Sequence, residues 1–185
     1  MNLFMLLPTL KTKRLRLRQA NMGDAADLFE YSKDPKVAQH VLWEAHRNIN
    51  ETKRYIRYLI KQYRGGYPST FVIEHVEKNK VIGTIGFSWV EDVNKAAEIG
   101  YSLNREYWNK GIMTEALKAV LEYAFTELNL NRVEAQHELS NPSSGRVLEK
   151  VGMKYEGCMR QRIYNKGKYV DVAVYAILRE DERVH

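Results

Sequence analysis

The chain has 185 residues, of which 44% are hydrophobic and 28% charged, which is typical of a folded globular protein rather than of a disordered or fibrous one. This length favours one domain, and we expect a single domain over residues 1–185. The 29 Lys and Arg residues outnumber the 23 Asp and Glu residues, and the net charge of +6 favours polyanions such as RNA or a polyphosphate cofactor. The single cysteine, Cys158, excludes an intrachain disulfide and a multi-cysteine metal cluster.

Targeting and metal-binding signals are weak. The apolar run from Leu3 to Leu7 stops at Pro8 and lacks a basic leader, so it is too short for a signal peptide or a membrane span. The five histidines show no spacing of the His-x-x-x-His kind, and we therefore expect no metal. Together with the lone cysteine, which we expect to pack within a strand, these features predict a cytoplasmic protein without a membrane partner.

The first half of the chain predicts strands and helices in turn. Residues 12–18 alternate basic and apolar side chains, which is typical of a half-buried strand. We expect Asp24 to cap a helix that begins at Ala25, and Asn50 to cap a second helix that ends at Gly65 and Gly66. Three strands should follow as an antiparallel meander, over residues 70–76, 80–90 and 96–103.

The second half contains the clearest helix. Its apolar residues recur at helical spacing and predict a strongly amphipathic helix: Ala116, Leu117, Val120, Leu121, Ala124, Phe125 and Leu128. A strand over 132–139 and a short helix over 143–151 should follow. The chain should end in a hairpin of residues 155–164 and 169–178, turned by residues 165–167. The order of elements predicts an α+β fold with helices that flank a central sheet.

The loop before the amphipathic helix has the layout of a phosphate cradle. Backbone N–H groups at a helix N-terminus lack internal partners, and Gly111 permits a close approach or a positive φ. Lys110 could add positive charge. One glycine before a helix is also commonly a simple turn, so both interpretations stay open. The absence of the Gly-x-x-x-x-Gly-Lys-Ser/Thr and Gly-x-Gly-x-x-Gly patterns excludes nucleotide hydrolysis and nicotinamide chemistry by those motifs.

Four segments carry a familiar pattern: Glu98-Ile99-Gly100-Tyr101, residues 108–116, Asn141-Pro142-Ser143-Ser144 and residues 149–153. In this order and spacing they resemble the GNAT superfamily of acetyl-CoA-dependent N-acetyltransferases. The ending, with Glu156 to Arg160 and residues 165–171, is similar to the Rim-type ribosomal-protein N-acetyltransferases within it. The resemblance covers nearly the whole chain.

The resemblance implies a mixed, mostly antiparallel, splayed sheet. Acetyl-CoA should lie between the strand that ends near Leu103 and the strand over 132–139, with its pyrophosphate on the amides of residues 109–114. The implied cofactor-binding residues are Tyr101, Leu103, Asn109, Lys110, Gly111, Ile112, Met113, Thr114 and Asn141. Met113 and Trp108 depart from the usual loop of the superfamily, and Leu148 stands where many members have a general-acid tyrosine.

Two residues are candidates for catalysis. Glu98 shares one strand face with Gly100 and Ser102, so its carboxylate could take a proton from an amine directly or through a water; the alternative is an exposed or ion-paired strand residue. Ser144 stands where the Rim-type enzymes have a serine near the CoA sulfur, and the alternative is a serine that satisfies a helix N-terminal amide. Glu115 is a competing base, but we expect it to pair with Lys118.

The expected function is transfer of acetyl from acetyl-CoA to a primary amine, in particular the N-terminal α-amine of a ribosomal protein, in a ternary complex. A small amine such as a polyamine, an amino sugar or an amino-acid-like toxin is the alternative acceptor. A non-catalytic module that binds ribosomal RNA fits the charge. It lacks interleaved aromatic and basic residues on a strand, so we expect no direct nucleic-acid binding. Monomer and dimer both stay open.

Overall fold

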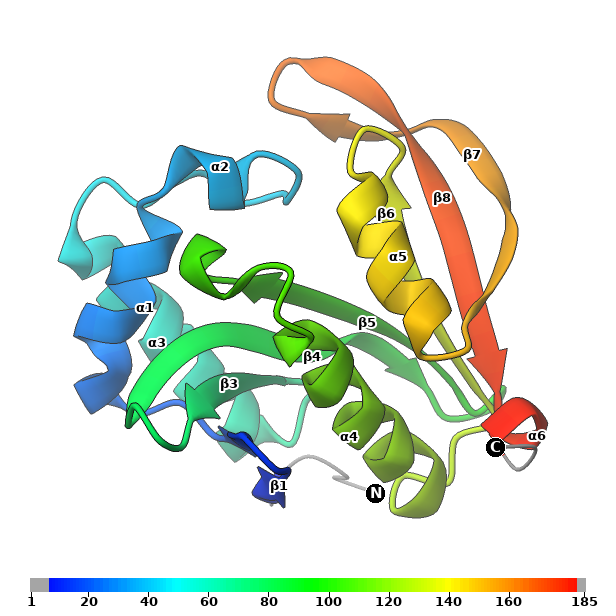
Figure 1. Ribbon diagram of the computed structural model, residues 1–185, viewed down its shortest axis with the longest axis horizontal. Helices are drawn as coiled ribbons and strands as arrows, with labels where there is room; N and C mark the ends of the chain where they lie inside the picture. The colour runs from blue at the N-terminus through cyan, green and yellow to red at the C-terminus, as the bar shows by residue number, and fades with distance from the viewer. Residues whose placement is uncertain (1–6, 183–185) are drawn as a thin grey trace.

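The computed structural model describes residues 7–182, so most of the apolar run at residues 3–7 lies outside the described residues (Figure 1). The strands are β1 (Leu10–Lys11), β2 (Leu15–Arg18), β3 (Thr70–His75), β4 (Lys80–Glu91), β5 (Ala96–Leu103), β6 (Arg132–Glu138), β7 (Lys154–Asn165) and β8 (Lys168–Leu178). The α-helices are α1 (Ala25–Ser32), α2 (Pro35–Ala38), α3 (Ile49–Gly65), α4 (Ile112–Thr126), α5 (Pro142–Lys150) and α6 (Arg179–Glu182). Short 3-10 turns, η1 (Met22–Asp24) and η2 (Arg105–Tyr107), precede α1 and α4.

The strands form one sheet in the order β1-β2-β3-β4-β5-β6-β8-β7. Over residues 7–182, β5 and β6 are the one parallel pair and every other neighbouring pair is antiparallel. The predicted meander is confirmed as β3, β4 and β5. The α+β fold with a mixed, mostly antiparallel sheet is confirmed as well.

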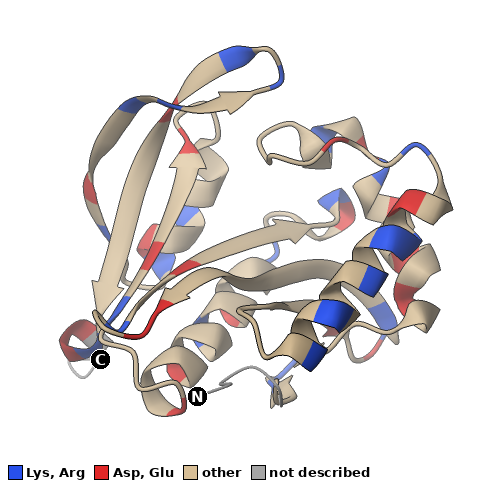
Figure 2. Cartoon of the chain, turned by 180° about the vertical axis from the view of Figure 1, so that it is seen from behind, with Lys and Arg blue, Asp and Glu red and all other residues tan. Residues whose placement is uncertain are grey.

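Helices cover both faces of the sheet. Two views from opposite sides place α3 on one face and α4 on the other (Figures 1 and 2). The amphipathic pattern explains this packing, since Ile56 and Leu59 of α3 are buried, as are Leu117 and Val120 of α4. The outer face of α3 carries a row of exposed cations, visible in Figure 2: Arg54, Arg57, Lys61 and Arg64.

One of the two predicted helix caps is in place. Asp24 is the N-cap residue of α1, which begins at Ala25 as predicted, although its side chain makes no capping bond to that helix. Asn21 caps the preceding turn η1 by accepting from the Gly23 amide at 2.8 Å, and the buried Asp24 carboxylate accepts from the Asn21 amide and from both terminal nitrogens of Arg18. The predicted cap of α3 is wrong by two residues: the cap is Asn48, whose side chain accepts from the amide of Asn50. Gly66 ends α3 in the left-handed conformation, at φ 67°.

The sheet splits where β5 and β6 separate. They pair only through residues 96–98 and 132–134. On the other side of β5, a bulge between Phe87 and Trp89 shifts the register of β4 opposite Glu98. A bulge bends its strand and increases the local twist. Beyond Glu98 and Glu134, β5 and β6 no longer pair, and the β7–β8 hairpin is attached to β6.

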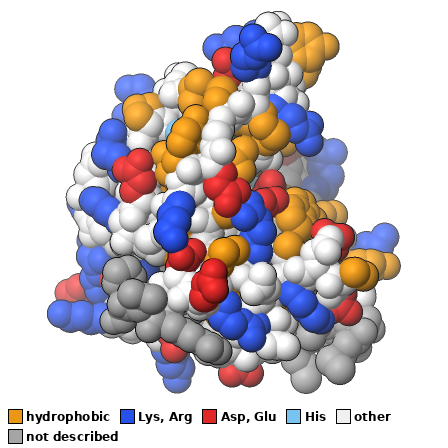
Figure 3. All heavy atoms as spheres, turned by 90° about the vertical axis from the view of Figure 1, so that its right-hand side faces the viewer, with side chains coloured by type: hydrophobic (Ala, Val, Ile, Leu, Met, Phe, Trp, Pro, Cys, Tyr) orange, Lys and Arg blue, Asp and Glu red, His pale blue; other side chains and the backbone are white. Residues whose placement is uncertain are grey.

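The hairpin closes at Lys166 and Gly167, both with positive φ (48° and 86°), which suits the right-handed twist of its strands and confirms the predicted turn. Its outer strand β7 carries exposed hydrophobic side chains on the face seen in Figure 3. Cys158 is exposed on this strand, so its expected place in strand packing is wrong. Within residues 7–182, no helix is long and apolar enough to cross a membrane.

Candidate active site

A cleft of about 710 Å³ opens between the separated parts of β5 and β6. Its walls are residues 98–103, residues 136–138, the N-terminal ends of α4 and α5, and the segment 36–43. Ten of the predicted site residues line it together: Glu98, Tyr101, Leu103, Asn109, Gly111, Ile112, Met113, Thr114, Asn141 and Ser144.

Lys110 is the predicted site residue that the cleft does not include. Its ammonium lies 5.7 Å from the centre of the Tyr107 ring, and its carbonyl accepts a hydrogen bond from Arg14 Nη1 at 2.9 Å. The lysine thus holds the loop in place through its backbone, whereas its charge lies over an aromatic face.

The start of α4 presents free backbone donors. The amide of Glu115 is bonded to the Gly111 carbonyl at 3.0 Å, so the amides of the preceding first turn have no partner within the helix. Asn109 and Gly111 both have positive φ, 59° and 70°, and such alternation curls successive N–H groups toward one centre. This concave set of donors matches a diphosphate in charge and in hydrogen-bonding chemistry.

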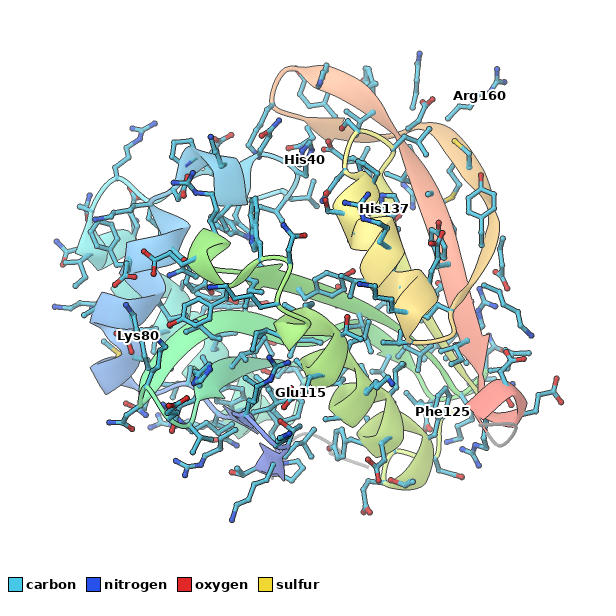
Figure 4. The ribbon with its side chains drawn as sticks, viewed as in Figure 1. His40, Lys80, Glu115, Phe125, His137 and Arg160 are labelled. Atoms are coloured by element: carbon cyan, nitrogen blue, oxygen red, sulfur yellow. The ribbon has the colours of Figure 1, made fainter. Side chains whose placement is uncertain are left out.

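Glu115 anchors this loop to the N-terminal strands. Its carboxylate accepts from Thr12 Oγ1 at 2.6 Å, the Arg14 amide at 2.8 Å and Arg14 Nε at 2.7 Å, not from the expected Lys118. Burial alone would raise the pKa of Glu115, but these hydrogen bonds outweigh it and lower the pKa. Figure 4 shows Glu115 on the side of α4 that faces β1. Glu115 lies outside the cleft, and these three hydrogen bonds occupy its carboxylate.

Glu98 is half-buried at the point where β5 and β6 part. Burial raises the pKa of its carboxyl above the ordinary value, and the neighbouring Glu134 carboxylate raises it further. Gln136 Nε2 donates to Glu98 Oε2 at 3.0 Å and fixes the carboxylate. A carboxylate with a raised pKa is a stronger proton acceptor than an exposed one, which suits a general base.

Ser144 contacts the opposite wall of the cleft. Its hydroxyl lies 2.9 Å from the hydroxyl of Tyr101, and Tyr101 also donates to the Ser144 carbonyl at 3.2 Å. Burial raises the pKa of Tyr101 to about 12, so the tyrosine stays protonated. Leu148, one helical turn further along α5, is fully buried in the core.

Neutral hydroxyls line the cleft on the Glu98 side: those of Thr70, Thr84, Ser88 and Ser102 on the sheet, and that of Tyr55 on α3. Two carboxylates line it, Glu98 and Glu138. The Glu138 carboxylate is occupied, since it accepts from His40 Nδ1 at 3.0 Å and Ser140 Oγ at 3.1 Å. Among residues 7–182, no group of three or more His, Cys, Asp or Glu side chains is placed to hold a metal ion.

Sequence reasoning missed Gln136, Glu138 and Arg14. Gln136 could have been found, because it follows Arg132 and Glu134 with period two on the strand predicted to lie beside Glu98. The pairing of Arg14 with Glu115 spans 101 residues and has no local signal.

The comparisons agree with this geometry. Residues 14–154 match the family model of the acetyltransferase (GNAT) domain. An uncharacterized N-acetyltransferase, p20 of Bacillus licheniformis, is 34% identical over 95% of this chain and 98% of its own. The ribosomal-protein-serine acetyltransferase of Escherichia coli strain K12 is 31% identical over 68% of this chain and 69% of its own.

A solved structure adds a ligand to the comparison. RimL, a ribosomal L7/L12 α-N-protein acetyltransferase in complex with coenzyme A, has a TM-score of 0.83 and 27% identity, and the match covers 92% of this chain and 98% of that one. The free amides at the start of α4, the split sheet and the sequence matches over most of the chain lead to one assignment. The chain belongs to the GNAT family of N-acetyltransferases, in its Rim-type branch.

Proposed function

We propose that this N-acetyltransferase moves the acetyl group of acetyl-CoA to the N-terminal α-amine of a protein, with a ribosomal protein as the acceptor class. The observation that carries the proposal is the shared cleft: a carboxylate with a raised pKa lies on one wall, and a cradle of free amides lies at its other end. Both substrates would meet in this cleft, so transfer is direct.

Acetyl-CoA would supply an activated acetyl thioester. In support, the amides of Ile112, Met113 and Thr114 lie at the cleft and offer donors for a diphosphate. Asn141, at the N-cap of α5, lines the same cleft and makes no capping bond with its side chain, which leaves its amide group free for the pantetheine arm. The complex of the RimL relative with coenzyme A supports the same ligand.

The chain's own residues would handle the protons. Glu98 would take the proton from the ammonium form of the acceptor, directly or through a water, because an amine must be neutral to attack a carbonyl. Ser144 would donate a hydrogen bond to the departing sulfur, which takes its proton from the nitrogen of the tetrahedral intermediate. The Tyr101 hydroxyl would orient Ser144 by donating to its Oγ across the 2.9 Å contact, which leaves the serine hydrogen for the sulfur.

The charge of the cleft favours a protein α-amine over a polyamine. A polyamine carries two or more positive charges, each of which needs a partner when it leaves water. Of the two carboxylates that line the cleft, Glu138 is already bonded by His40 and Ser140. Glu98 alone remains to receive a cation, which fits one amine followed by a neutral, hydroxyl-rich surface.

A panel of acceptors tests the proposal. CoA release would be measured with acetyl-CoA and N-terminal peptides of ribosomal proteins, the same peptides with blocked N-termini, and spermidine. We expect turnover with free N-termini only. Turnover with spermidine but with no peptide would move the function to small amines.

A further inference from the structure

A bridge of polar contacts crosses the cleft at the segment 36–43. It joins the segment after α2 to the end of β6 and the β7–β8 turn, and consists of His40, Glu138, Asn165 and Lys166 with the carbonyls of Val41 and Trp43. Figure 4 shows His40 directed from the α2 segment toward the end of β6. The bridge thus connects the segment after α2 to the part of the sheet formed by β6, β7 and β8.

Glu138 is the centre of the bridge. Only 6% of this residue is exposed, and its carboxylate accepts from His40 Nδ1, Ser140 Oγ and Asn165 Nδ2. Burial by itself raises the pKa of Glu138, but the hydrogen bonds from these three residues outweigh it and the pKa is lowered. An ionised carboxylate accepts only, so Nδ1 of His40 carries the hydrogen of the shared bond.

Lys166 makes a second connection between the β7–β8 turn and the segment after α2, through backbone carbonyls of that segment. The turn presents its ammonium to three oxygens, the carbonyl of Val41 at 2.5 Å, the carbonyl of Trp43 at 3.3 Å and Asn165 Oδ1 at 3.2 Å. All three donors of the ammonium are therefore used. The exposed hairpin end is held to the backbone of the α2 segment.

The bridging residues also bound the cleft. His40, Val41, Trp43 and Glu138 all line it, as does Glu98. We infer that the bridge sets the width of the acceptor entrance, so that an amine at the end of a slender, extended chain reaches Glu98, whereas an amine on a folded surface is excluded. This inference rests on the proposed function and narrows its acceptor class to unstructured chain ends.

A pair of matched acceptors tests the inference. One acceptor peptide would be fused to a folded domain either directly or through a long flexible linker, and the ratio of kcat/KM for the two fusions would be measured. We expect wild type to favour the linker strongly. Lys166→Met and His40→Ala should each lower this ratio by about fivefold, the factor that corresponds to losing one partly exposed charged contact. Lys168→Met is the control, since Lys168 is exposed on the same turn and its side chain takes no part in the bridge.

Hydrogen exchange gives a readout that does not depend on turnover. Amides of residues 40–46 should exchange faster in Lys166→Met than in wild type or Lys168→Met. An unchanged linker ratio in both Lys166→Met and His40→Ala, or unchanged exchange in Lys166→Met, overturns the inference. If wild type binds acetyl-CoA but acetylates no amine, the proposed function fails instead, and the exchange result alone decides whether Lys166 holds the segment.

Discussion

At the scale of single residues, Glu98 makes the sharpest prediction. Glu98→Gln keeps the shape of the side chain and its contact with Gln136 but removes the proton acceptor. We expect kcat to fall by about 10²- to 10⁴-fold, the usual contribution of a general base. Steady-state kinetics would also follow kcat/KM of wild type against pH, which should fall as the pH drops through the raised pKa of Glu98, because only the ionised form accepts a proton.

Glu134→Gln is the matched control for this prediction. Glu134 is a second carboxylate near Glu98, but it does not line the cleft. Its removal should lower the pKa of Glu98 and move the acidic limb of the profile to lower pH, with the plateau rate retained. An equal loss of kcat in both variants would show that Glu98 acts through the local charge rather than as the base.

The raised pKa of Glu98 also predicts an effect on stability. At a pH below about 4.3, the ordinary pKa of a glutamate, the Glu98 carboxyl is neutral in both the folded and the unfolded states. As the pH rises through the higher pKa of the folded state, the carboxyl becomes charged in its half-buried site and the free energy of unfolding falls. Glu98→Gln should therefore melt at a higher temperature than wild type at pH 8, with no difference near pH 4. A lower Tm of Glu98→Gln than of wild type at pH 8 would show that the half-buried charge of Glu98 does not destabilise the fold.

Variants at Tyr101 and Ser144 distinguish the orienting role of the tyrosine from the hydrogen bond that the serine would donate to the sulfur. Ser144→Ala removes the proposed donor and should lower kcat by about tenfold, which corresponds to one hydrogen bond of about 1.4 kcal/mol. Tyr101→Phe keeps the serine and should cost less. Burst and steady-state rates would check both variants, and a larger loss in Tyr101→Phe than in Ser144→Ala would reverse the two roles.

At the scale of elements, the start of α4 depends on a backbone conformation. Gly111→Ala adds a Cβ to a residue with φ 70°, a backbone conformation that residues with a side chain rarely adopt. The nearest atom to this Cβ would be Arg14 Nη2 at 3.6 Å, so the substitution strains the backbone without causing a steric clash. We expect a loss of about 1 kcal/mol of stability and a raised KM for acetyl-CoA. Gly167→Ala carries similar strain at φ 86° on the hairpin turn and should leave that KM unchanged. Thermal unfolding and initial rates would compare the two; equal KM values would contradict the role of the loop.

The same elements show what a sequence can predict. Periodicity and turn residues were sufficient for the strands, the α4 helix and the hairpin turn, since these depend on neighbours in the chain. The position of Asp24 at the start of α1 was predicted, but the ion pair of its carboxylate with Arg18 was not. The bond between His40 and Glu138 spans 98 residues, and the bulge of β4 opposite Glu98 depends on packing across the sheet. Such features have no local signal.

At the scale of the whole molecule, ligand binding should stabilise the fold through linkage. Acetyl-CoA at about 100 times its Kd should add about 2.7 kcal/mol, or a rise in Tm of about 5–10 °C for a chain of this length. S-acetylpantetheine lacks both the diphosphate and the adenosine, so at equal concentration it should give a much smaller rise, and Gly111→Ala should reduce the rise from acetyl-CoA if the start of α4 binds the diphosphate. Differential scanning fluorimetry measures both. Equal rises in Tm from the two ligands would show that contacts between β5 and β6, rather than the start of α4, supply the binding energy. In that case Gly111→Ala would leave the rise in Tm from acetyl-CoA unchanged.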